Sequence, residues 1–180
     1  MKKWKRFAAW VLMAAMVMML LTACGGGGSS APSVTPDTSR EKQMIEYVQN
    51  YVRNYCNAEL AEENGEIRDA LYSVLPQAVS CINGKIEGND TSGQMDRLVN
   101  TLDQKMRTQN RKGFFFTDGF VGFLTESGVN EWLSENQMDL YIGELRRLGV
   151  EPKHISVAAT TQFNSTVGMD VVYIVLTIMD

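Results

Sequence analysis

The sequence predicts an α+β fold in which three amphipathic helices precede a small antiparallel sheet with one further helix and a C-terminal β-hairpin. Two patterns predict this class. Apolar residues recur every three or four positions across residues 40–110, which is the period of a helix with one buried face. Residues 155–163 alternate like a strand, and residues 171–179, after a polar turn at 164–168, are apolar without interruption.

Three segments carry the helical period. The first spans 40–63, the second 66–82, and the third runs from about Met95 to about Asn110. Thr38 and Glu41 have the spacing of a capping box, so we expect the fold to begin near residue 38. Pro76 predicts that the second helix ends or kinks near Leu75. The pair Asn83-Gly84 leaves open an alternative in which the second half of that segment is a strand before a hairpin.

The remaining elements follow from glycine, proline and alternation. Residues 113–124 are aromatic and punctuated by glycine, which predicts one or two short strands with a turn at Asp118-Gly119. Residues 129–148 are helical, and an interruption stays open because Ser134 and Gln137 have capping-box spacing of their own. Gly149 supplies a left-handed position after this helix, and a proline follows it at 152.

The last strand is apolar on both faces. Val172, Ile174, Leu176 and Ile178 need one cover, and Val171, Tyr173 and Val175 need another. We therefore expect residues 171–179 at the centre of the sheet, beside 155–163 and 113–117, with helices packed on one face. A helix, a surface close to lipid or a partner could cover the second face.

The first 24 residues have the pattern of an export signal. Lys2, Lys3, Lys5 and Arg6 open the chain without an acid, and the run from Phe7 to Leu21 is almost entirely apolar. This run is shorter than the roughly 20 residues of a membrane-spanning helix. An ordinary signal peptide, or a short anchor helix with an incidental cysteine, is the alternative interpretation.

The end of this leader, Leu21-Thr22-Ala23-Cys24, resembles the lipobox of bacterial lipoproteins. The resemblance implies removal of residues 1–23 as a signal peptide and lipidation of Cys24 through a thioether, with palmitate-type acyl chains. Several chains anchor a protein stably. Residues 24–37 would then be a flexible tether and 38–180 a single globular domain on the extracytoplasmic face of the cell membrane. Gly25 offers no aspartate-type retention signal, which favours a Gram-positive surface over a periplasmic face.

The charge of the mature part excludes one class of partner. The leader holds four of the 17 Lys and Arg residues and none of the 21 acids, which leaves 13 basic side chains and a net charge of −8 rather than −4. Nucleic acid needs a basic footprint and is therefore not expected as a partner. We expect no cofactor, because the sequence contains no motif that binds one. The acid-rich residues 59–69 lack the spacing of a calcium-binding loop.

Two groups of side chains are candidate binding surfaces for an envelope protein or a glycan. The first group is a row of tyrosines on one helix: Tyr47, Tyr51 and Tyr55. The second is a basic group with the first residue of the aromatic run that follows it: Lys105, Arg107, Arg111, Lys112 and Phe114. Both groups have a structural interpretation as well, because tyrosines can flank a core and cations favour a helix C-terminus.

The residues that could carry chemistry are few. His154 is the only histidine, and no nucleophile or metal-ligand spacing surrounds it. Cys56 and Cys81 could be buried thiols, a disulfide or a redox pair. A straight hairpin of the first two helices would hold them about 12 Å apart along the axis, farther than a disulfide reaches. We therefore expect a non-enzymatic binding or adaptor module, with a small envelope hydrolase or thiol-redox protein as the alternative.

Overall fold

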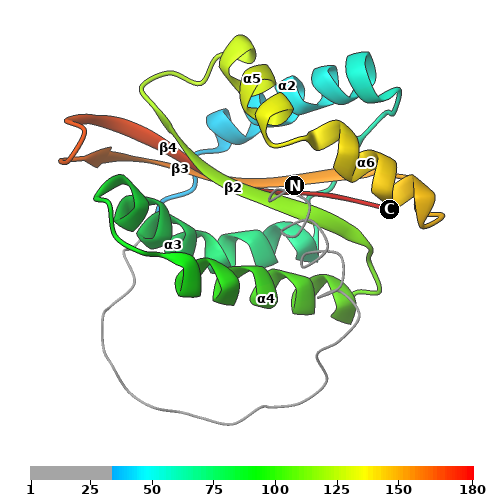
Figure 1. The fold of residues 1–180 in the computed structure, drawn as a ribbon, viewed down its shortest axis with the longest axis horizontal. Coiled ribbons are helices and arrows are strands. Elements are labelled where there is room, and N and C mark those ends of the chain that lie inside the picture. Colours follow the sequence, from blue (N-terminus) through cyan, green and yellow to red (C-terminus); the bar gives the residue numbers. More distant parts are fainter. Residues whose placement is uncertain (1–33) are drawn as a thin grey trace, which may run out of the picture. The chain divides into compact units, whose positions relative to one another are not determined.

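A computed structural model describes residues 34–180 (Figure 1). The predictions about the leader, Cys24 and the first part of the tether lie outside these residues. The described part contains five helices: α2 (Thr38–Cys56), α3 (Glu66–Ile86), α4 (Ser92–Thr108), α5 (Glu126–Glu135) and α6 (Met138–Arg147). Its four strands are β1 (Ala61–Glu62), β2 (Gly113–Val121), β3 (His154–Asn164) and β4 (Met169–Met179), which form one sheet in the order β1-β3-β4-β2.

The α+β class and the C-terminal hairpin are confirmed, but two details differ from the prediction. The sheet is mixed rather than antiparallel, because the short strand β1 pairs in parallel with β3. Two helices, α5 and α6, lie between β2 and the hairpin instead of one. The break falls at Gln137, whose φ of 59° is left-handed, so the interruption that the capping-box spacing left open is real.

Strand β4 lies at the centre of the sheet with β3 and β2 on its two sides. Val172, Ile174, Leu176 and Ile178 pack in one core cluster with α2, α5 and α6. Val171, Tyr173 and Val175 pack in clusters with α3 and α4. The prediction of two covers is confirmed. Of the three possible covers for the second face, the structure has helices, so helices lie on both faces of the sheet (Figure 1).

Helix α2 ends seven residues before the predicted end at Glu63. Asn57 adopts a left-handed conformation with φ 50° and ψ 50°, which asparagine tolerates better than most residues. Leu60 continues the apolar stripe in sequence and is buried outside the helix. At the start of the helix the cap is Asp37, whose side chain accepts a hydrogen bond from the Arg40 amide at 3.2 Å.

Helix α3 continues through Pro76 to Ile86, so the predicted end of the helix near Leu75 is wrong. A proline inside a helix costs about 3 kcal/mol, and the buried face on both sides of it, with Leu75 and Ala78 at 0% exposure, offsets this cost. The hairpin alternative at Asn83-Gly84 is also wrong. Asn83 is helical, and its side-chain oxygen accepts a hydrogen bond from Tyr173 Oη at 2.5 Å.

Strand β2 is one uninterrupted strand, so the predicted turn at Asp118-Gly119 is wrong. Its nine residues pair with β4 from Gly113 opposite Met179 to Val121 opposite Val171. Gly119 is needed for close packing, because a Cβ there would lie 2.9 Å from Ile82 Cγ2 on α3. The predicted left-handed Gly149 after α6 is confirmed by its φ of 74°.

Candidate functional site

The three tyrosines of α2 do not form one surface. Tyr51 is buried in the core, and Tyr47 packs against the same cluster. Tyr55 is 67% exposed, with its ring centroid 4.8 Å from that of Tyr51. Only Tyr55 therefore offers an open aromatic face.

The basic group and Phe114 also lie apart. Arg107 bonds Asp103 at 2.8 Å and Arg111 pairs with Glu63. The Lys112 amide donates to Asp180 Oδ1 at 3.0 Å. Lys105 lines a cavity of about 10 Å³ between α3, α4 and the sheet, which has room for about one water. Phe114 packs in the core cluster on the other face of the sheet.

His154 and the two cysteines have structural surroundings. His154 Nδ1 lies 3.9 Å from Glu63 Oε2, the carboxylate that also pairs with Arg111. Cys56 and Cys81 are buried free thiols, as one of the predicted alternatives had it. Burial, followed by the charge of Asp139, raises the pKa of Cys56, which disfavours the nucleophilic thiolate. Within residues 34–180, no group of three His, Cys, Asp or Glu side chains could hold a metal ion.

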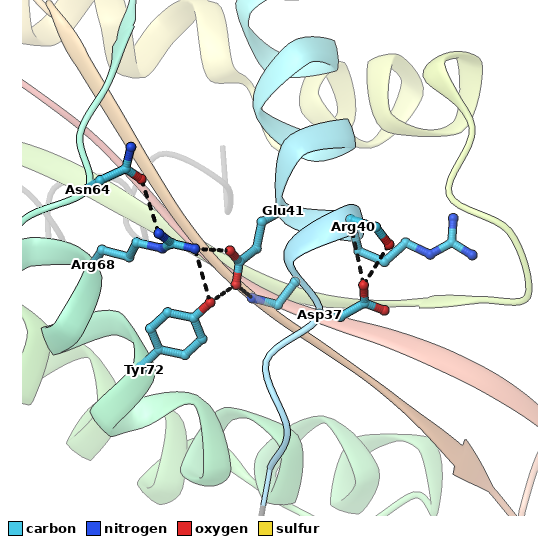
Figure 2. A network of polar contacts seen from close by, with 8 residues as sticks. Asp37, Arg40, Glu41, Asn64, Arg68 and Tyr72 are labelled. Atoms are coloured by element: carbon cyan, nitrogen blue, oxygen red, sulfur yellow. Dashed lines mark hydrogen bonds and ion pairs between the residues drawn. The ribbon is translucent and has the colours of Figure 1, made fainter.

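The most buried ionic contact of the described residues is one that the sequence did not indicate. Glu41 is 2% exposed, and its carboxylate accepts hydrogen bonds from Arg68 Nη2 at 2.5 Å and from Tyr72 Oη (Figure 2). It also accepts from the backbone amide of Ala159 on β3 at 3.3 Å. We call these four residues the Glu41 network. Burial, followed by the hydrogen bond to Glu41, raises the pKa of Tyr72 to about 12.

The Glu41 network belongs to the cover of the β3 edge. The N–H and C=O of one strand residue point to the same edge of a sheet. At Ala159 the N–H donates to Glu41 and the C=O accepts from the Asp37 amide at 2.9 Å. Thr160 Oγ1 donates to the Thr35 carbonyl at 2.8 Å. Residues 34–37, which we call the entry segment, and the carboxylate thus occupy the place of a further strand.

Asp37, at the start of α2, also joins the entry segment to β3 through hydrogen bonds to its carboxylate. Burial acts to raise the pKa of Asp37, but hydrogen bonds from Thr161, Ser39 and the Arg40 amide together lower it. The Thr161 hydroxyl lies 2.6 Å from Asp37 Oδ2. Each of these carboxylates is satisfied by protein groups, so the arrangement is structural and leaves no position for a ligand.

The opposite edge of the sheet is open. Among residues 34–180, no strand pairs with the outer edge of β2. Exposed edges are usually protected by proline, lysine or a bulge, yet residues 113–121 contain no proline, lysine or arginine. Their single charge, Asp118, accepts from Trp132 Nε1 at 2.7 Å and from the Gly119 amide. Every second residue of β2 therefore turns outward backbone groups that no strand of the described residues pairs.

An aromatic row follows this edge on the face of α5 and α6. It consists of Phe114, Tyr141, Phe116, Trp132 and Phe120, whose successive ring centroids lie 5.3, 5.3, 5.8 and 5.3 Å apart. The row is half-buried except for Trp132, which is 8% exposed. The sequence singled out only Phe114 from this row. The alternation of Phe114, Phe116 and Phe120 along one strand was the signal that could have identified the rest.

The open edge and the aromatic row together can bind an extended chain. The backbone groups of β2 can pair with an added strand, and the half-exposed rings can contact every second side chain of that strand.

No helix of residues 34–180 is long and apolar enough to cross a membrane.

Comparison with known proteins reveals no relative, since no family model, no curated protein and no solved structure matches the chain.

Proposed function

We propose that the protein is a membrane-anchored extracytoplasmic lipoprotein, a non-enzymatic binding or adaptor module of the cell envelope that takes an extended segment of a partner protein on the β2 edge. The observation that carries the binding function is the nine-residue open edge with its aromatic row. The charged opening, apolar run and terminal Cys24 of the leader support the anchor.

Strand addition explains why this edge lacks ordinary protection. Backbone hydrogen bonds to β2 give the affinity, and the pockets for alternate side chains give the specificity. On the face of the aromatic row, a partner would place apolar side chains beside Phe114, Phe116 and Phe120. An uncovered edge of this composition would otherwise invite aggregation.

A polypeptide is favoured over a glycan by the ring geometry. Sugar rings stack on open aromatic faces, but Phe116 meets Tyr141 and Trp132 edge to face, at interplanar angles of 89° and 71°. In each of these pairs the edge of one ring meets the face of the other, so neighbouring rings of the protein cover part of the ring faces. The outer edge of β2, in contrast, has no partner strand among residues 34–180. A hydrolase or redox function has less support, because burial raises the pKa of Cys56 and the carboxylate nearest to His154 is paired with Arg111.

The anchor is tested by Cys24→Ser. The full chain is expressed in a bacterial host that processes lipoproteins, and its membranes are fractionated with and without detergent. The wild type should need detergent for release, while Cys24→Ser should leave the membrane fraction without it. Equal retention of both proteins would reject the lipid anchor.

The β2 edge is tested by crosslinking in intact cells. A photoreactive phenylalanine analogue replaces Phe114 or Phe120, and the same analogue at the exposed Tyr55 is the control. An added strand should be captured from both edge positions, at two sites about six residues apart in one segment of one partner, and not from position 55. Capture from position 55 alone, or at unrelated sites, would reject strand addition, and capture of only a second copy would replace the adaptor by a homodimer.

A further inference from the structure

Most of the exposed large apolar side chains gather at one end of the sheet. Residues 34–180 expose eight such side chains, and five of them lie there: Val121, Phe123, Phe163, Val167 and Met169. We call these five residues the apolar tip. Phe123 and Phe163 are the most open, at 82% and 67% exposure. Single exposed apolar residues are ordinary, whereas a group of them marks a contact surface.

The tip is built on paired strands. Phe163 lies opposite Asp170 and Val121 opposite Val171, and the Gly122 amide donates to the Asp170 carbonyl at 2.8 Å. Asn164 orders the turn by accepting from the amides of Thr166 and Val167. The β3–β4 hairpin extends past the helices on both faces (Figure 1), so a flat surface can reach these side chains.

The described chain begins near this same end. Val34 packs against the cluster of Val79, Ile82, Val171 and Tyr173. The entry segment is bonded to Thr160, which lies four residues before Asn164, or about 13 Å along a strand. The Glu41 network fixes this path, since it ties the start of α2 to both α3 and β3 (Figure 2).

We propose that the apolar tip rests in the lipid surface that holds the anchor on Cys24, an inference that rests on the proposed lipoprotein function. Val34 follows Cys24 by ten residues, and a stretch of this length spans at most about 33–36 Å whatever its conformation. The anchor thus holds the end of the domain that carries the tip within a short distance of the membrane.

The chemistry of the tip indicates an apolar contact with lipid rather than an electrostatic one. The mature part is acidic, and the exposed Asp170 lies next to Met169 of the tip. Anionic headgroups would therefore add no attraction, whereas phenylalanine, valine and methionine are favourable at the boundary of headgroups and acyl chains. The contact should persist at high salt and on zwitterionic vesicles.

The test places an environment-sensitive fluorophore at either end of the sheet. Val167→Cys puts the label in the tip. Leu148→Cys puts it on an apolar residue of 60% exposure after α6, six residues before the start of β3 at the opposite end. The lipidated full-length variants are reconstituted into phosphatidylcholine vesicles, and labelled wild type gives the background from the buried Cys56 and Cys81.

On vesicles, the fluorescence emission of the label at 167 should shift to the blue, and an aqueous quencher should reach this label several-fold less. High salt should not change either result. The label at 148 should stay accessible to the quencher. Phe123→Ser with Phe163→Ser should restore quenching at 167 without releasing the protein from the vesicles. Proteins that float with the vesicles but show equal quenching at both labels would overturn the inference and leave the anchor intact.

Two further outcomes would also overturn it. Shielding at 167 that appears without vesicles and rises with protein concentration would assign the tip to a second copy of the chain. A lipid-processed sample that does not float at all would reject the anchor itself, and the inference with it.

Discussion

The two edges of the sheet differ in how their backbone groups are satisfied. At the β3 edge, β1 pairs with residues 154 and 155, and the entry segment with Glu41 satisfies Ala159. At the β2 edge, nine residues without proline or a basic side chain have no partner among the described residues. The covered edge contains the buried ionic contact, and the open edge contains the half-exposed aromatic rings. The buried polar contacts at the β3 edge serve structure, whereas the proposed binding surface lies at the edge that no described strand covers.

The largest effect is expected from breaking the covered edge. Glu41→Ala removes the acceptor of Arg68, Tyr72 and the Ala159 amide, and should lower the free energy of unfolding by about 2–4 kcal/mol. Urea denaturation measures this loss. Glu46→Ala, an exposed acid on the same helix, is the matched control and should change stability by less than about 0.5 kcal/mol. Equal effects of the two variants would contradict the role of Glu41.

A smaller effect is expected at the start of the open strand. A Cβ on Gly113 would lie 2.1 Å from the Ile178 carbonyl oxygen, so Gly113→Ala must displace β2 from β4 and should cost about 1–3 kcal/mol. Hydrogen exchange should then accelerate at the β2 amides first. Gly93→Ala, on α4 with open space around the added carbon, should not destabilise the protein. Unchanged β2 protection in Gly113→Ala would show that the edge can shift without loss.

The third effect depends on pH. The pKa of Tyr72 is raised to about 12 from an ordinary 10.0, so the folded state retains this proton more tightly than the unfolded state. Its contribution is complete below pH 10 and is lost as the pH rises through 12. Between pH 10 and pH 12 the free energy of unfolding of the wild type should fall by about 1–2 kcal/mol more than that of Tyr72→Phe, with allowance for the partial exposure of the ring. The free energy of unfolding of both proteins is measured by urea denaturation from pH 9 to 12. The same dependence on pH in both would contradict this assignment.

The smallest effect is expected beyond the open edge. Phe123 is 82% exposed, so Phe123→Ser should change the free energy of unfolding by less than about 0.5 kcal/mol. Thermal unfolding of the variant checks this value. A loss above 1 kcal/mol would mean that the ring packs within the fold and is not available to lipid.

The sequence predicted those elements that local pattern determines. The alternation of residues 155–163 and the two-sided apolar run of 171–179 predicted the hairpin and the central strand, because burial dictates both patterns. The end of α2 was not predictable from its apolar stripe, since Leu60 stays buried after the helix has ended. Pro76 was misleading because a local cost was outweighed by tertiary burial on both sides of it.

The candidate sites were harder to predict, because they depend on which elements meet in space. Glu41 had the spacing of a cap, and nothing near it in sequence revealed that Arg68 and Ala159 would surround its carboxylate. The cation group and Phe114 are close in sequence, yet Phe114 packs on the face of the sheet opposite α4. The apolar run of 171–179 predicted β2 and β3 on the two sides of β4, but no local pattern showed that β1 would pair with β3 and leave the outer edge of β2 without a strand among the described residues.

The attachment of the entry segment has a mechanical consequence. A pulling force on the chain ahead of Val34 reaches the Asp37–Ala159 backbone bond and the Glu41–Arg68 ion pair before it reaches the later turns of α2. These contacts join the start of the helix to β3 and to α3, so the load is shared by the sheet and a second helix. A force applied to the chain ahead of Val34 should therefore not unwind α2 from its N-terminal end while these contacts hold.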